Sequence, residues 1–247
     1  MLLHLLHLGR VDYREALDLQ QRLAGLRKQQ RIGDVLLLLE HPPVLTLGRN
    51  AHRENILASD AELARRGIAV HEINRGGDVT YHGPGQLVGY PILDMRGDFP
   101  DKKGPHLGAV DYVRCLEEVL IRTCAEYGVL TERIPGRTGV WTRAGGSIPA
   151  KKIAAIGVHI SQGVTSHGFA LNVTTDLRDF QWIVPCGIAD AAVTSLEEES
   201  DMDIAGAPAM EQAVHRVSRN FGRIFGRQIL WMESVEDLLA ATGGSLQ

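Results

Sequence analysis

The 247-residue sequence contains few cysteines and few aromatic residues, and it has little net charge. Its three cysteines lack the spacing of metal ligands, which favours a reduced compartment over a disulfide framework. Aromatic residues make up 5% of the chain and the formal net charge is -4, so neither a base-stacking surface nor a general basic field is expected. The composition therefore argues against nucleic acids as partners.

The sequence also lacks a long hydrophobic run. No stretch reaches the roughly 18 apolar residues that indicate a membrane-spanning helix. The first residues, MLLHLLHLGRVDY, are apolar, but they include two histidines and have neither a basic start nor a small-residue cleavage site. These features predict a cytoplasmic protein with no membrane partner.

What is present is an ordinary globular composition, with 44% hydrophobic and 23% charged residues, which permits a sizeable core. Many short strand-like runs are interspersed with amphipathic helical stretches. We predict an α+β fold with mixed, largely antiparallel sheets and flanking helices. We expect one domain over residues 1–247, with a helical C-terminal part from about residue 205. The expected strands include Leu3–Leu8, Val35–Leu39, Val44–Leu47, Ile68–Ile73 and Leu87–Leu93, and the expected helices include Tyr13–Gln30, Gly108–Gly128 and Met210–Leu230.

A glycine-rich stretch, RGGDVTYHGPGQ from Arg75 to Gln86, separates two of these strands. It is longer than a hairpin turn, which predicts a functional or irregular loop. The segment GPGQLVG reads G-x-G-x-x-x-G without a helix pattern after it, and G-K-[ST] is absent, so neither nucleotide-binding motif is matched. Gly76 and Gly77 would let the main chain approach a substrate closely. Arg75 beside them could hold an anion or lock the loop by a salt bridge.

Cys186 differs from the other two cysteines because it lies outside any helical periodicity, in IVPCGI. This context suits an accessible thiol but also an ordinary turn. Lys152 opens the apolar strand KIAAIGV, where exposure at a strand end is the simpler explanation. A zinc site made of His82, His167 and Cys186 fits no standard zinc spacing. A thiol nucleophile needs a neighbour that favours the thiolate, and the sequence offers five candidates: Lys151, Lys152, His82, His159 and His167.

Several stretches together resemble the lipoyl(octanoyl) transferases, and the resemblance spans roughly residues 30 to 200. The strongest match is the pattern R-G-G-x-x-T-Y-H-G-P-G-Q. The matching stretches are LLLLEHPPVLTLGR (Leu36–Arg49), RGGDVTYHGPGQLVGYPI (Arg75–Ile92), KIAAIGV (Lys152–Val158), SHGFALNV (Ser166–Val173) and PCG (Pro185–Gly187). The resemblance implies the fold of the catalytic domains of biotin and lipoate protein ligases.

The resemblance also implies an activity. An octanoyl group would pass from octanoyl-acyl carrier protein to a lysine of the lipoyl domains of 2-oxoacid dehydrogenase complexes and of the glycine cleavage H protein. A cysteine and a lysine, here Cys186 and Lys152, would perform the transfer through a thioester, without ATP, metal or another cofactor. The implied substrate-binding residues are Arg75, Gly76, Gly77, Asp78, Val79, Thr80, Tyr81, His82, Ala155, Ile156, Gly157, Gly168, Phe169 and Ala170.

The residue types agree with this chemistry. A cationic Lys152 would lower the pKa of the Cys186 thiol and could later accept a proton from the attacking amine. Main-chain N–H groups near Gly76–Gly77, Gly157 or Gly168 are candidates for stabilising the oxyanion. We expect Tyr81 and His82 to face the acyl thioester, with Tyr81 also contributing to an apolar channel. Burial of each CH₂ contributes about 0.8 kcal/mol, enough for selection of chain length.

The sequence is also compatible with two other functions. An ATP-dependent lipoate or biotin ligase would share the fold and use a lysine at the same strand, but would not need the Cys186 thiol. A module that binds carrier protein without catalysis would form no acyl-enzyme. Because carrier proteins of this kind are acidic, docking would require a local basic patch, for which Arg49, Arg53 and Arg143 are candidates.

Overall fold

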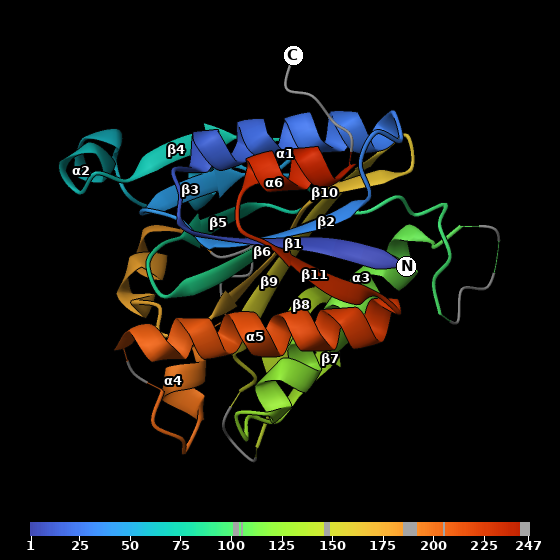
Figure 1. Cartoon of the computed structure of the whole chain (residues 1–247). Helices are drawn as coiled ribbons and strands as arrows, with labels where there is room; N and C mark the ends of the chain where they lie inside the picture. The colour runs from blue at the N-terminus through green and yellow to red at the C-terminus, as the bar shows by residue number, and fades with distance from the viewer. Residues whose placement is uncertain (101–103, 105, 146–148, 185–191, 205, 243–247) are drawn as a thin grey trace.

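The computed structural model describes residues 1–100, 104, 106–145, 149–184, 192–204 and 206–242. Within them, the chain forms a large mixed sheet and a small one, with helices on both faces of the large sheet (Figure 1). None of the described helices is long and apolar enough to cross a membrane. The elements are β1 (Leu2–Arg10), α1 (Tyr13–Lys28), β2 (Asp34–Glu40), β3 (Val44–Leu47), η1 (Arg53–Asn55), α2 (Asp60–Arg65), β4 (Ala69–Glu72), β5 (Val79–His82), β6 (Gln86–Ile92), α3 (Ala109–Ala125), β7 (Thr131–Ile134), β8 (Arg137–Thr142), β9 (Lys152–Ser161), β10 (Val164–Asn172), η2 (Leu177–Trp182), α4 (Leu196–Glu199), α5 (Gly206–Phe225), β11 (Gln228–Met232) and α6 (Val235–Thr242).

The large sheet has the strand order β11-β1-β2-β6-β10-β9-β8-β7 among the described residues. The strands β11, β1 and β2 are parallel, whereas each later neighbouring pair is antiparallel. Helices α1 and α6 cover one face, and α3 and α5 cover the other (Figure 1). Strand β2 therefore has core on both sides: Leu36 and Leu38 pack towards α3 and α5, and Leu37 and Leu39 towards α1 and α6. The predicted α+β class with mostly antiparallel pairing is confirmed.

The sequence predicts a loop over the whole glycine-rich stretch Arg75–Gln86, but the structure has a loop over only part of it. Its centre forms strand β5, which pairs antiparallel with β3, and β3 pairs on its other edge with β4. Val79, Thr80 and Tyr81 are β-formers, but the glycines on both sides conceal so short a strand in the sequence pattern. The two strands predicted on either side of this stretch thus belong to different sheets, since β4 lies in the small sheet and β6 in the large one.

The C-terminal segment also differs from its prediction, because the helix expected to reach Leu230 stops earlier. Helix α5 ends at Phe225 and is followed by Gly226, whose φ of 61° lies in the left-handed region that terminates helices. Residues Gln228–Met232 then form β11, which extends the large sheet by pairing with β1. Pairing with a strand more than 200 residues earlier cannot be read from local periodicity.

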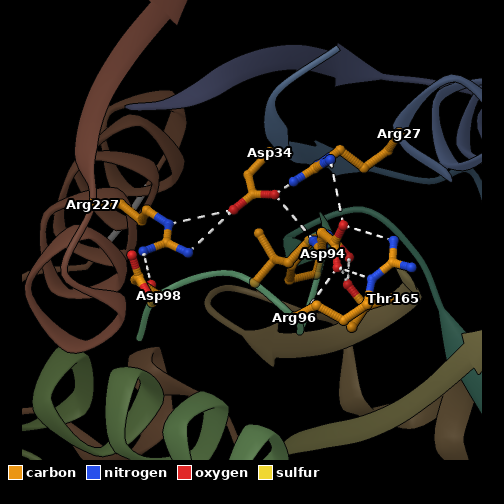
Figure 2. A network of polar contacts seen from close by, with 9 residues as sticks. Arg27, Asp34, Asp94, Arg96, Asp98, Thr165 and Arg227 are labelled. Carbon is orange, nitrogen blue, oxygen red and sulfur yellow. Dashed lines mark hydrogen bonds and ion pairs between the residues drawn. The ribbon is translucent and has the colours of Figure 1, made fainter. Parts of the chain in front are cut away.

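A network of charges fastens this C-terminal strand to the rest of the sheet (Figure 2). Asp34, at the start of β2, accepts from Arg227 Nη2 at 3.3 Å and from Arg27 Nε of α1 at 2.9 Å. Asp94 binds Arg96 at 2.8 Å and lies 3.6 Å from Arg27. The hydrogen bond from Arg96 lowers the pKa of the Asp94 carboxyl. Because Arg227 and both carboxylates are buried, each charge depends on its partners for compensation.

Candidate active site

A cavity with about 480 Å³ of empty volume lies between β5 of the small sheet and strands β6, β9 and β10 of the large sheet. The fold thus brings most of the predicted substrate-binding residues into one cavity, although they come from distant parts of the chain. Gly76, Val79 and Tyr81 of the predicted set do not line it. The lining residues are Tyr13, Arg75, Gly77, Asp78, Thr80, His82, Val88, Tyr90, Ala155, Ile156, Gly157, His167, Gly168, Phe169 and Ala170.

Small side chains on two neighbouring strands create the floor of this cavity. Gly157 and Gly168 are paired across β9 and β10, and so are Ala155 and Ala170. Alternate residues of a strand point to the same face, so these four residues form one patch without bulky groups. A Cβ on Gly157 would lie 2.9 Å from the Gly76 carbonyl oxygen, so this close approach requires glycine.

Arg75 fastens the wall opposite this floor. Its guanidinium donates to the Thr46 carbonyl oxygen at 2.6 Å and to the Thr46 hydroxyl at 2.9 Å, and it also donates to the Gly76 carbonyl. Of the two sequence-based hypotheses for Arg75, these contacts favour locking of the loop, through hydrogen bonds to β3. The Gly76 N–H donates to the Val158 carbonyl of β9, so it is not available to an oxyanion.

The alternation of β5 decides which of its side chains reach the cavity. Thr80 and His82 line it, whereas Val79 and Tyr81 belong to a separate apolar cluster on the other side. The Tyr81 hydroxyl donates to Asp179 Oδ2 at 2.7 Å, and burial together with this bond raises the Tyr81 pKa. Tyr81, which the sequence analysis expected to face the acyl thioester, therefore points away from this cavity, because adjacent residues of a strand point in opposite directions.

A chain of side-chain amides holds His82 in one tautomer. Asn172 Nδ2 donates to the Thr194 carbonyl at 2.8 Å, which turns its Oδ1 towards Gln86 Nε2 at 2.9 Å. Gln86 Oε1 then faces His82 Nδ1 at 2.7 Å, and a carbonyl oxygen can only accept. The proton of His82 is therefore on Nδ1, and Nε2 is an acceptor. Burial lowers the His82 pKa to about 3, so the ring is neutral at neutral pH.

Sequence reasoning did not identify the aromatic side of the cavity. Tyr13 at the start of α1 stacks on His82 with ring centroids 6.2 Å apart. The Tyr90 hydroxyl donates to His41 Nε2 at 2.7 Å, because His41 Nδ1 donates to the Val11 carbonyl. Burial lowers the pKa of His41 to about 4. One sign of this arrangement is visible in the sequence: His41 directly follows the apolar run LLLLE, in a segment whose other residues predict core.

Lys152 lies at the start of β9, on the strand that supplies the floor, but outside the cavity lining. Its side chain is buried and its Nζ is 4.8 Å from the centre of the Trp141 ring. Its main-chain N–H donates to the Ala192 carbonyl, and its carbonyl accepts from Thr194. These contacts show that Lys152 is fully incorporated in the fold, not exposed at a strand end. Cys186 lies outside the described residues.

Solved structures share this fold. A bi-partite lipoate protein ligase from Thermoplasma acidophilum superposes with a TM-score of 0.68 at 17% identity, covering 98% of this chain and 91% of that one. A lipoate-protein ligase A bound with ATP gives a TM-score of 0.70 at 16% identity, covering 98% of this chain and 93% of that one. The architecture is thus that of the lipoate ligase catalytic domain.

Sequence comparison narrows the class to a family. The family model for the lipoyl protein ligase A/B catalytic domain matches residues 12–222. The octanoyltransferase of Acidobacterium capsulatum is 64% identical over 241 residues, which cover 97% of this chain and 96% of that protein. The octanoyltransferase of Koribacter versatilis is 54% identical over 238 residues, covering 96% and 90%. The chain therefore belongs to the lipoyl protein ligase A/B family, in its branch of octanoyltransferases, which are acyltransferase enzymes.

Proposed function

We propose that this protein moves an octanoyl group from octanoyl-acyl carrier protein to a lysine of a lipoyl domain through a thioester on Cys186. The main structural support is the cavity, whose floor of small residues follows β9 from Gly157 to Ala155, in the direction of Lys152. An alkyl chain fits such a floor, and each buried CH₂ contributes about 0.8 kcal/mol to its binding.

The transfer takes two balanced steps. First, the Cys186 thiolate attacks the donor thioester, a new carbon–sulfur bond forms, and the carrier's thiolate leaves. Second, the neutral amine of the acceptor lysine attacks the acyl-enzyme, the Cys186 thiolate leaves, and the amine loses a proton. Because the donor is already a thioester, neither step requires activation by ATP. A cationic Lys152 would lower the Cys186 pKa for the first step and would then protonate the departing carrier thiolate. The neutral Lys152 that results would take the amine's proton in the second step.

Two contacts of Lys152 support this role. The Trp141 ring, itself buried, lies against Nζ and favours a cation there. The hydrogen bonds to Ala192 and Thr194 attach the chain just beyond residues 185–191 to the same strand as Lys152. Ala192, which follows Cys186 by six residues in the sequence, is thereby held beside Lys152 on β9.

The acceptors would be lipoyl domains of 2-oxoacid dehydrogenase complexes and the glycine cleavage H protein, in the cytoplasm. For docking of an acidic carrier protein, Arg49 and Arg143 are better candidates than Arg53. All three are exposed, but Arg53 is engaged with Asp60 in an ion pair. Charge reversal of Arg49 and Arg143 should raise KM for the carrier protein at low salt, and an unchanged KM would exclude this docking surface.

Mass spectrometry of the acyl-enzyme tests the proposal. Incubation with octanoyl-acyl carrier protein should add one octanoyl mass, which hydroxylamine removes. Cys186→Ala should abolish the adduct. Cys115→Ala, which removes a partly exposed thiol in α3, should keep it. Labelling of Cys186→Ala, or acylation that requires ATP and free octanoate, would overturn the proposal in favour of a ligase.

A further inference from the structure

A second cavity, with about 680 Å³ of empty volume, adjoins the first one, which is called the acyl cavity from here on, at α1 and the far end of β9. Its lining comes from α1, from Asn74 and from the ends of β9 and β10 that are distant from Lys152. Among the described residues, His167 is the one that borders both cavities. The His167 side chain therefore forms part of the partition between them.

The second cavity is polar where the acyl cavity is mostly apolar. Gln20 is 1% exposed, and its Nε2 has no hydrogen-bond partner among the described residues. His159 Nδ1 is also buried and has no such partner among these residues. Lys28 donates to Ser161 at its edge. An alkyl chain entering this space would separate Lys28 and Ser161 from water and would offer no partner to Gln20 Nε2 or His159 Nδ1, which is unfavourable.

His167 is held rigidly in the partition. Its main-chain N–H donates to Gln20 Oε1 at 2.9 Å, and its ring Nε2 donates to Asn74 Oδ1 at 2.7 Å. The residue is 3% exposed, and its φ of 55° lies in the left-handed region, which is uncommon for residues other than glycine. A left-handed backbone held by one side chain from α1 and one from the segment between β4 and β5 indicates a position with a defined task.

The position of His167 along the strand matches the length of an octanoyl chain. Ala170 pairs with Ala155, at the end of the cavity nearest Lys152, and His167 pairs with Val158. Three residues of a strand span about 10 Å. An extended octanoyl chain, with carbon–carbon bonds of about 1.5 Å, measures roughly 9 Å from its carbonyl carbon to its methyl group.

We propose that His167 is the end wall of the acyl cavity and that it limits the acyl group to about eight carbons by separating the cavity from the polar space behind it. This inference rests on the proposed function, since it assumes that the cavity holds the acyl chain. His167 thus acts as a specificity-determining residue, through contact with the end of the acyl chain.

His167→Gly is the direct test, because glycine accepts the left-handed backbone and only the ring is lost. Gln162→Gly is a matched control: Gln162 has a φ of 53°, is exposed, and lies in the turn between β9 and β10. His167→Asn, which also tolerates this backbone and is shorter, serves as a second variant should glycine loosen the strand. Each variant is assayed with octanoyl-, decanoyl- and dodecanoyl-acyl carrier protein, and the ratio of kcat/KM values is compared.

The expected result is a rise of at least about tenfold in the dodecanoyl-to-octanoyl ratio for His167→Gly, with a smaller rise for His167→Asn and none for Gln162→Gly. An unchanged ratio in both His167 variants would overturn the inference. So would folded His167 variants that transfer no chain of any length, because the ring would then serve the reaction itself. Absence of octanoyl transfer by the unmodified protein would instead refute the proposed function.

Discussion

Acidification from about pH 8 to about pH 5 should destabilise this protein through the three histidines buried around its cavity. Burial lowers the pKa of His41 to about 4, of His82 to about 3 and of His167 to about 4, from an ordinary value of 6.5. A group with a depressed folded pKa binds fewer protons in the folded than in the unfolded state. Stability is therefore complete above the unfolded pKa of 6.5 and decreases as the pH falls through it.

The size of the effect follows from linkage. At about pH 5 each histidine is protonated in the unfolded chain and neutral in the folded protein, which costs about 2 kcal/mol per histidine and roughly 6 kcal/mol together. Total stabilities are about 5–15 kcal/mol, so the loss is a large fraction. Carboxylates contribute little to the change in stability between about pH 8 and about pH 5. Those with resolved shifts have pKa values lowered from 3.8 or 4.5, so their contribution begins to disappear only below these values.

Urea unfolding followed by circular dichroism at the two pH values measures the difference directly. His82→Asn keeps a donor for Gln86 Oε1 but does not titrate, so it should reduce the pH dependence by about 2 kcal/mol. His52→Asn, at an exposed histidine, should leave it unchanged. A free energy of unfolding that differs by less than about 1 kcal/mol between the two pH values would refute the reasoning.

Three further changes test other parts of the structure. Asp34→Asn removes the carboxylate that compensates buried Arg227, and urea unfolding should show a loss of about 3–5 kcal/mol. Tyr81→Phe should lower the free energy of unfolding by about 1 kcal/mol and leave octanoyl transfer within about twofold, because its hydroxyl faces away from the cavity. Lys152→Ala should shift the pH profile of Cys186 alkylation by iodoacetamide to higher pH, because the cation proposed to favour the thiolate is lost.

Matched controls and contrary outcomes are available for each. Arg178→Gln breaks an exposed ion pair and should leave the free energy of unfolding nearly unchanged, so an equally small change in Asp34→Asn would contradict the role of burial. Lys151→Ala is the control for Lys152→Ala. It removes the neighbouring lysine, which pairs with Glu199, and should leave the pH profile of Cys186 alkylation unchanged. A large loss of octanoyl transfer in Tyr81→Phe would contradict the prediction and would indicate that the Tyr81 hydroxyl contacts the acyl group.

Local sequence rules predicted most elements of the fold. Val44–Leu47 was predicted with its observed bounds, and the helices predicted over Tyr13–Gln30 and Gly108–Gly128 are observed as Tyr13–Lys28 and Ala109–Ala125. The errors occurred where pairing partners are distant. Strand β5 and strand β11 are short, and they form because β3 and β1 offer open edges. Propensity over four or five residues is too weak to reveal such strands by itself.

For the candidate site, the sequence alone supplied the family resemblance, the residue types, and the grouping of Arg75–His82 with the small residues of the β9 and β10 stretches. It could not decide which side chains share a face. Thr80 and His82 line the cavity while Val79 and Tyr81 do not, because strand alternation acquires a direction only when a second layer covers one face.

Only the tertiary structure revealed His41, the tautomer of His82 and the place of His167 between an apolar and a polar cavity. Each of these depends on atoms from elements far apart in the chain. Residue types and local conformation are written in neighbouring residues, whereas burial, hydrogen-bond partners and pKa values arise from packing between distant ones. The sequence determined the chemistry available to this protein, and the fold decided where each group is placed and in which protonation state.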